Sequence, residues 1–164
     1  MKKYFVFVCL SLMSFASFAQ SQISVKAVSA SSVYPSDGSS YYPKYAIDKN
    51  NNTAWFPRRT DKANRGEWIK FEFERPSAVK YVKIINGWAR KSSDWRRNSR
   101  VQTATITLSS GTTKEIVLKD TMSVQEFELP IEASDWITLT INDIYAGNRW
   151  NHEAGITQVS FYSG

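Results

Sequence analysis

Several short segments of this chain alternate strictly between apolar and polar residues, and this period most constrains the fold. The clearest case is 69–74, where Ile and Phe alternate with Lys and Glu, and the period recurs at 103–108, 136–141 and 157–162. Successive side chains of a β-strand point to opposite faces of its sheet, so the pattern indicates strands buried on one face. No window has a sustained helical period. We therefore predict an all-β fold, an antiparallel β-sandwich or jelly roll.

Two further segments agree with a sandwich. Residues 79–85 place apolar or aromatic side chains on both faces, which is typical of a central strand. Ser-Ser-Gly-Thr at 109–112 lies between two alternating segments and predicts a hairpin turn. The order of the strands does not follow from the periodicity.

Residues 1–19 have the pattern of a secretory signal peptide. Two lysines precede an apolar run too short to span a membrane, and small residues come before Gln20. We therefore expect an exported protein, periplasmic or secreted, whose residues 20–164 form a single domain. The only cysteine, Cys9, lies within the signal. The domain would then have no disulfide and would depend on its core or on a metal for stability.

The segment from Tyr45 to Trp55 is a polar turn with an apolar residue near each end. It is dense in Asn and Asp, whose side chains bond to nearby backbone and tolerate left-handed conformations. Asp48, three Asn residues and Thr53 also concentrate oxygen atoms in a short span, as a hard cation such as calcium requires. We predict that this polar corner is a structured turn of the β fold and a candidate calcium site.

Positive charge is concentrated in three segments that break the strand pattern, 56–66, 88–100 and 145–153. The chain has 21 basic and 15 acidic residues, and these segments hold ten of the basic and three of the acidic ones. The positive charge is therefore not spread evenly over the surface. The aromatic and imidazole side chains in the same segments are Phe56, Trp88, Trp95, Tyr145, Trp150 and His152.

Arginine interleaved with tryptophan in loops permits two interpretations. Tryptophan faces stack on sugar rings or bases, and arginine binds hydroxyl, carboxylate, sulfate or phosphate groups, so the loops can form a ligand site. Alternatively, the tryptophans close the ends of the sandwich and the arginines are only solvated. Trp95, flanked by Asp94 and Arg96, is the strongest candidate for an exposed stacking side chain.

Catalytic motifs are absent from the sequence. It has no Gly-x-Ser-x-Gly, no phosphate-binding glycine loop and too few histidines for a two-histidine metal site. A carboxylate pair for glycoside hydrolysis would be Asp94 with Glu153, since both lie in the basic loops. We predict a non-catalytic protein.

Several short motifs carry a family resemblance. In chain order they are Ala-Ser-Ser at 30–32, Ala-Ile-Asp at 46–48, Thr-Ala-Trp at 53–55, Gly-Glu-Trp-Ile at 66–69, Ile-Asn-Gly-Trp at 85–88 and Asn-Ser-Arg at 98–100. Together they resemble a discoidin domain, or coagulation-factor type C domain, of the galactose-binding-like fold. The later motifs are similar to one subfamily, the glycan-binding domain attached to secreted bacterial NAD glycohydrolases, which assists toxin translocation. The resemblance covers residues 24–162, and we expect only the binding module, without the NAD-cleaving activity.

This resemblance implies a jelly-roll β-sandwich and, as in many members, one structural calcium ion. By the family pattern, Asp48 and Thr53 would bind calcium through side chains, and Tyr45 and Asn50 through backbone carbonyls. Gln158 stands where the family usually has a glutamate. A neutral amide adds no charge, so we expect weaker calcium binding.

The resemblance also implies ligand binding by loops at one end of the sandwich, where the basic and aromatic segments fall. We predict a carbohydrate-binding module, and the charge favours an anionic glycan. The candidate ligand-binding residues are Arg58, Arg59, Asn86, Trp88, Trp95, Arg96, Asn98, Arg100, Trp150 and His152. One alternative is a protein-interaction module, such as an adhesin, an inhibitor or an accessory subunit of a secreted enzyme. Another is binding of nucleic acid or anionic lipid, although export disfavours intracellular nucleic acid.

Overall fold

The computed structural model describes residues 20–35 and 41–164. The predicted signal peptide, 1–19, and its Cys9 lie outside the described residues. The elements of the described part are, in chain order, β1 (Gln22–Ile23), β2 (Val25–Ala30), the 3₁₀ helix η1 (Pro43–Ile47), β3 (Trp68–Ala78), β4 (Tyr81–Asn86), α1 (Ser92–Arg97), β5 (Ser99–Leu108), β6 (Thr113–Val117), β7 (Gln125–Glu128), β8 (Ala133–Tyr145) and β9 (Ala154–Tyr162).

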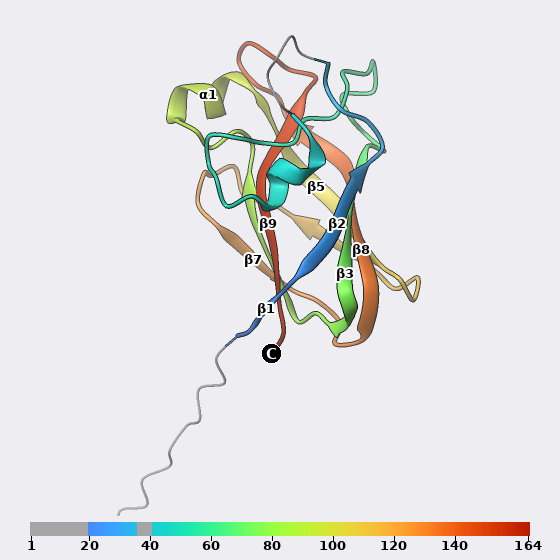
Figure 1. The fold of residues 1–164 in the computed structure, drawn as a ribbon. Helices are drawn as coiled ribbons and strands as arrows, with labels where there is room; N and C mark the ends of the chain where they lie inside the picture. Colours follow the sequence, from blue (N-terminus) through green and yellow to red (C-terminus); the bar gives the residue numbers. More distant parts are fainter. Residues whose placement is uncertain (1–19, 36–40) are drawn as a thin grey trace, which may run out of the picture.

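The strands form two layers, which confirms the predicted antiparallel β-sandwich (Figure 1). One layer has the order β2-β3-β8-β5-β6, and the other has β9 paired with β1 and β4, and β4 paired with β7. These pairs are antiparallel. A short parallel pair, Ser99–Ala154 and Arg100–Gly155, joins β5 to β9 and so connects the two layers at one end.

The apolar positions of the alternating segments face inward, as predicted. In the first layer, Phe71 of β3 lies opposite Ile137 of β8, and Ile69 lies opposite Leu139. Leu139 also faces Ile106 of β5 across the next pair. All five of these side chains are buried. The inward face is therefore continuous across three strands, as a period of two requires when the register is kept.

Aromatic side chains connect the two layers in the core. The ring of Phe161 from β9 meets the rings of Phe71 and Phe73 from β3 edge to face, at centroid distances of 5.1 and 5.2 Å. Trp55 is fully buried in the same core. Burying one such side chain stabilises the folded state by about 1.5–3 kcal/mol.

The predicted central strand and hairpin are both confirmed. β4 lies between β9 and β7. At 109–112, the amide of Leu108 donates to the carbonyl of Thr112 at 2.9 Å, which closes the turn between β5 and β6. Gly111 has a φ of +92°, a conformation that glycine adopts without steric cost.

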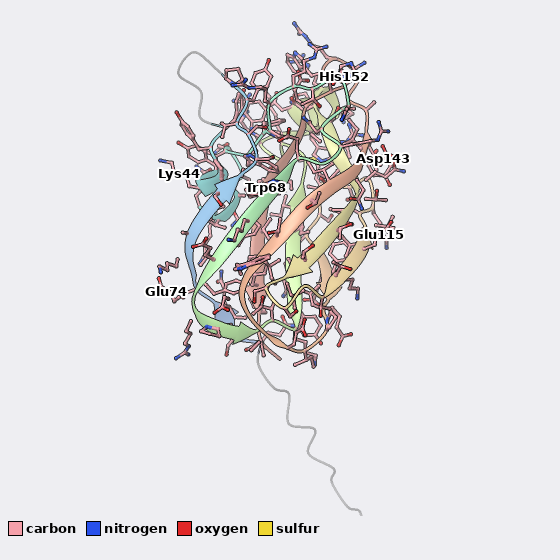
Figure 2. The ribbon with its side chains drawn as sticks, turned by 90° about the vertical axis from the view of Figure 1, so that its right-hand side faces the viewer. Lys44, Trp68, Glu74, Glu115, Asp143 and His152 are labelled. Carbon is pink, nitrogen blue, oxygen red and sulfur yellow. The ribbon has the colours of Figure 1, made fainter. Side chains whose placement is uncertain are left out.

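The three basic segments lie at one end of the sandwich, and the C-terminus lies at the other (Figure 1). Figure 2 shows His152 at this loop end and Glu74 towards the opposite end. α1 is a six-residue helix within 88–100, and η1 enters the polar corner. Neither these helices nor any other described segment forms a helix long and apolar enough to cross a membrane.

Candidate functional site

A pocket of about 180 Å³ opens among the loops at this end. All three basic segments contribute to it, together with the chain that precedes the polar corner. Its lining residues, which define the aromatic pocket, are Tyr34, Tyr41, Phe56, Trp88, Asn98, Trp150 and Glu153. Five aromatic rings, one amide and one carboxylate therefore surround a single cavity.

Backbone hydrogen bonds bring the distant parts of the pocket wall together. The amide of Tyr34 donates to the carbonyl of Phe56 at 2.8 Å, and the amide of Phe56 donates to the carbonyl of Tyr41 at 3.3 Å. Gly155, at the start of β9, lies directly behind Phe56. A Cβ at this glycine would come within 2.4 Å of a Phe56 ring carbon, so only glycine allows this approach.

A buried asparagine joins the first basic segment to the residue that follows Glu153. Asn64 is fully buried with a φ of +60°. Its side-chain amide donates to the carbonyl of Arg58 at 2.8 Å, and its side-chain oxygen accepts from the amide of Ala154 at 2.7 Å. Asn64 therefore fixes the position of Glu153 relative to the loop that carries Arg58.

Three of the aromatic rings stand nearly perpendicular to one another. Tyr41 and Phe56 meet at 72° with centroids 5.0 Å apart, and each meets Trp88 at 5.9 Å, at 89° and 78° respectively. The indole N–H of Trp88 donates to the carbonyl of Asn52 at 3.0 Å, so the polar corner holds this ring in place. Burial raises the pKa of the Tyr41 phenol, which keeps its hydroxyl protonated and able to donate.

The polar groups of the pocket are Asn98 and Glu153, and both side chains are buried. Asn98 is 7% exposed and uses its amide N–H to bond the carbonyl of Asp94 at 2.9 Å. Glu153 is 5% exposed, and one of its carboxylate oxygens lies 3.6 Å from Nε of Arg59. No described residue donates a hydrogen bond to this carboxylate. Trp150, at 39% exposure, lies at the rim.

The polar corner is closed by its own hydrogen bonds. Asp48 accepts from the amide of Asn50 at 2.9 Å and from the hydroxyl of Thr53 at 2.7 Å. The side-chain oxygen of Gln158 accepts from the amide of Lys49 at 2.9 Å. Three of the five predicted calcium ligands, Asp48, Asn50 and Thr53, therefore lie in one hydrogen-bonded turn. Gln158 on β9 is joined to this turn through Lys49, and Tyr45 lies in η1. Asp48 is the only charged ligand among the five, and no group of three His, Cys, Asp or Glu suited to a metal occurs in 20–35 and 41–164.

This donor set fits a calcium ion in its oxygen chemistry but not in its charge. Calcium prefers six to eight oxygens, commonly with several carboxylates. Here the carboxylate of Asp48 and the amide oxygen of Gln158 already accept hydrogen bonds from the turn. The calcium site stays a prediction, and the oxygens that would bind the ion also accept the hydrogen bonds of the turn.

Two predicted ligand residues have structural roles instead. Asn86 is fully buried, donates to the carbonyl of Val101 at 2.7 Å and accepts from the amides of Val101 and Gly87 at 3.0 Å each. Arg100 is 6% exposed and forms two parallel bonds with Asp120, at 2.9 and 2.8 Å. Their hydrogen-bonding groups are committed within the fold, which argues against the predicted role of these two residues in holding a ligand.

Trp95 is also not the exposed stacking residue that we predicted. It is half-buried, and its indole N–H donates to the carbonyl of Asn86 at 3.1 Å. The guanidinium of Arg100 lies 4.5 Å from the centre of its ring. Asn86, Trp95 and Arg100 thus form a structural unit, the buried cluster. Trp150 is the more exposed tryptophan of the two.

The remaining predicted residues lie at the loop end with different surroundings. Arg58 and Arg96 are exposed. Arg59 is exposed and faces Glu153 at the pocket. His152 is half-buried, and its Nδ1 is buried without a hydrogen-bond partner among the described residues. Trp88, Asn98 and Trp150 line the pocket, as the prediction of a ligand site requires.

Much of the positive charge is neutralised by neighbouring carboxylates. Four loop arginines form ion pairs: Arg59 with Glu153, Arg65 with Asp143, Arg90 with Asp94, and Arg100 with Asp120. The hydrogen bond from Arg90, at 2.7 Å, lowers the pKa of the Asp94 carboxyl, although burial of the carboxyl opposes this shift. Asp94 is thus paired with Arg90 and is not among the residues that line the pocket with Glu153.

The predicted ligand-binding residues did not include four of the wall residues, Tyr34, Tyr41, Phe56 and Glu153. Phe56 and Glu153 lie in basic segments, whereas Tyr34 and Tyr41 precede the polar corner, outside any basic segment, and their neighbours show no strand period. The backbone bonds to Phe56 are what bring them to the pocket. The sequence holds no local signal for such a contact.

Comparisons with known proteins agree with this fold. The profile of the NAD glycohydrolase translocation F5/8 type C domain matches residues 19–162. No curated protein sequence matches the chain significantly. Among solved structures, the CBM32 of AlyQ in complex with 4,5-unsaturated mannuronic acid has a TM-score of 0.64 and 19% identity, over 88% of this chain and 99% of that one.

Two other structures give a similar result. The family 32 carbohydrate-binding module of Clostridium perfringens NanJ in complex with galactose has a TM-score of 0.61 and 17% identity, over 84% of this chain and 93% of that one. A truncated AlyQ with CBM32 and alginate lyase domains matches with a TM-score of 0.64 and 19% identity over 88% of this chain. This chain spans 34% of that longer protein. At such identities the likeness shows the fold alone.

Proposed function

Because this chain belongs to the family of NAD glycohydrolase translocation F5/8 type C domains, we propose that it is an exported, non-catalytic carbohydrate-binding module. Its binding site is the aromatic pocket at the loop end. The observation that carries this proposal is the convergence of five aromatic rings and two polar side chains on one cavity. Sugar rings have apolar C–H faces and polar edges, so aromatic walls with a few placed polar groups suit them.

Each part of the pocket has a role in this proposal. Trp150, the exposed ring at the rim, stacks on the face of a sugar ring. Trp88 and Tyr41 form the inner wall, and the protonated Tyr41 hydroxyl donates to a ring substituent. The carboxylate of Glu153 accepts hydrogen bonds from the ligand. A cavity of about 180 Å³ is suited to one sugar unit, so further units would extend over the rim.

The basic loops are the second part of the proposed site. No basic side chain is among the residues that line the pocket. Arg58, Arg96 and Arg149 are exposed in the loops around the same end. Anionic groups of a glycan would therefore bind at these rim arginines and not inside the cavity. This division accounts for a basic loop end that surrounds a mainly aromatic pocket.

Two observations support a binding role over catalysis. The pocket contains one carboxylate, Glu153, whereas glycoside hydrolysis generally uses two facing carboxyl groups. The single histidine has its Nδ1 buried and is not part of the pocket lining. Export rests on the signal-like pattern of residues 1–19 and on the family, whose description refers to translocation.

A glycan panel tests this proposal directly. The protein beginning at Gln20 is applied to an array of neutral, amino and anionic glycans, and hits are measured by calorimetry. Trp150→Ala should weaken binding of the best glycan about 10- to 30-fold, because it removes the ring proposed to stack on the sugar. Trp136→Ala is the matched control, since Trp136 lies on β8 away from the pocket, with the ammonium of Lys70 4.8 Å from its ring centre.

Three results would count against the proposed function. If no glycan on the panel binds at low salt with calcium present, the carbohydrate-binding function is wrong. If a protein from a host extract is captured through Trp150 and capture persists after glycosidase treatment, the protein-interaction alternative is favoured. Steep loss of binding with salt, independent of the aromatic residues, would indicate simple charge binding.

A further inference from the structure

The carboxylate of Glu153 is the only charged group among the residues that line the aromatic pocket. It is 5% exposed, and its nearest cation is Nε of Arg59 at 3.6 Å. The Arg59 side chain is itself 60% exposed, so this contact is not a buried, forked ion pair. Elsewhere Arg100 meets Asp120 through two bonds below 3 Å. A buried carboxylate without strong donors is costly, and a ligand that supplies a charged donor removes that cost.

The aromatic walls around this carboxylate pack closely on one another. Tyr41, Phe56 and Trp88 stand nearly perpendicular to one another with centroids 5.0 to 5.9 Å apart. In each pair the edge of one ring meets the face of another, so these contacts build the wall itself, and Glu153 is the group of the pocket that a cation would contact. Trp88 and Trp150 each already have an arginine within stacking distance, Arg90 at 4.3 Å and Arg149 at 4.8 Å.

We propose that the aromatic pocket selects a sugar unit with a free, protonated amino group, and that Glu153 is the counter-ion of this ammonium. This inference rests on the proposed function, because it names the class of sugar that enters the same pocket. A hydroxyl group at C2 of the sugar ring would offer Glu153 a neutral hydrogen-bond donor. An acetamido group at the same position has no charge and adds bulk, whereas an ammonium provides both a charge and several donors.

Arg59 has a distinct role in this arrangement. In the free protein its guanidinium partly compensates Glu153 from the solvent side. A bound ammonium takes over that contact, and Arg59 then becomes a repelling neighbour that can turn to solvent because most of its side chain is exposed. Removal of the Arg59 charge should therefore strengthen binding of an amino sugar and leave binding of a neutral sugar nearly unchanged.

The test compares ligands that differ at one position. Methyl glycosides of glucose and galactose are used with a hydroxyl, an acetamido or a free amino group at C2, and each is titrated by calorimetry at one pH and one salt concentration. The wild-type protein should bind the amino form about tenfold more tightly than the other two. Choline is included as a cation without a sugar ring.

Variants assign the preference to Glu153. Glu153→Gln keeps the size of the side chain and should remove the preference, so that the three forms bind within about threefold of one another. Glu115→Gln is the matched control, since Glu115 is exposed on β6 and does not line the pocket. Arg59→Gln should tighten binding of the amino form about two- to threefold. The melting temperature of each variant shows whether it is folded.

The possible results distinguish this inference from the proposed carbohydrate-binding function on which it rests. If wild type binds the hydroxyl or acetamido form as tightly as the amino form, the inference is wrong and the carbohydrate-binding function stands. If choline binds as well as the amino sugars, the pocket is a general cation site and the amino-sugar assignment is wrong. If no sugar binds here and the glycan panel is also blank, the proposed function itself fails. The comparison of the three ligand forms on the wild-type protein tests the inference even if Glu153→Gln does not fold.

Discussion

The buried cluster and the aromatic pocket lie at the same end of the sandwich but differ in what their polar atoms bind. In the buried cluster, Asn86 and Arg100 direct their hydrogen bonds to backbone groups and to Asp120. In the aromatic pocket, Glu153 accepts no hydrogen bond from a described residue, and Trp150 is exposed. Arg, Asn and Trp in a loop therefore do not by themselves identify a ligand site. Unused hydrogen-bonding capacity beside an open cavity is the better criterion.

The largest expected effect is on the buried cluster. Asn86→Ala removes three hydrogen bonds and leaves the amide and carbonyl of Val101 without their partner inside the fold. We expect the free energy of unfolding to fall by about 3 kcal/mol, since each stranded buried group costs about 1–3 kcal/mol. Urea unfolding measures this. Asn51→Ala is the control, because Asn51 lies in the exposed turn of the polar corner. Equal losses of unfolding free energy in the two variants would show that Asn86 has no special structural role.

A pair of tryptophan variants tests the comparison itself. Trp95→Ala removes a half-buried ring that stacks with Arg100 and donates to Asn86, so we expect a loss of about 2 kcal/mol in stability. Glycan affinity should be unchanged at temperatures where the variant is folded. Trp150→Ala should show the reverse, with weaker binding and nearly unchanged stability. If Trp95→Ala weakens binding while its melting temperature stays constant, the two regions have been assigned the wrong way round.

A smaller effect is expected from the ion pair between Asp94 and Arg90. The pKa of Asp94 is lower in the folded protein than in the unfolded chain, mainly because Arg90 donates to it. Its contribution to stability is therefore present above the unfolded pKa and is lost as pH falls through the folded pKa. Asp94→Asn should cost about 1.5 kcal/mol at pH 7. Unfolding measured from pH 7 down to acid should show this difference shrink.

The control for this measurement is Asp135→Asn, because Asp135 is exposed on β8. That variant should follow the wild-type pH profile. A difference between Asp94→Asn and wild type that stays constant down to strongly acidic pH would contradict the assignment to the charged pair.

The smallest effect should come from calcium at the polar corner. The turn is held by hydrogen bonds that the side-chain oxygens of Asp48 and Gln158 accept, and it offers one charged ligand. Millimolar calcium should therefore raise the melting temperature by only about 1–2 °C over a chelator, as expected for a weak site. Asp48→Asn should abolish that shift. A rise of about 10 °C or more would show a strong calcium site, and with it a corner that depends on its ion.

The fold class could be predicted well from the sequence, because strands and turns are encoded by patterns among neighbouring residues. The alternation at 69–74 recurs in three other segments, and a period of two fixes both the strand and its buried face. The hairpin at 109–112 follows from four residues. The order of the strands could not be predicted, because any alternating strand can pair with any other until the whole core is assembled.

The candidate site could be predicted only in outline. Trp88, Asn98 and Trp150 were predicted and line the pocket, whereas Asn86 and Arg100 are committed to the fold. Residue type distinguishes neither group, since both consist of polar and aromatic side chains in the same loops. The partners that separate them lie far away in sequence, as Asp120 does from Arg100.

By itself, the sequence determined the β-sandwich, the polar corner and the concentration of charge and tryptophan in three loops. Each of these is a property of neighbouring residues, so local periodicity and turn chemistry are sufficient. Only the tertiary structure decided which loop residues remain open to a ligand. Burial and hydrogen bonding depend on contacts between distant segments, such as those of Phe56 with Tyr34 and Tyr41, and no local pattern encodes them.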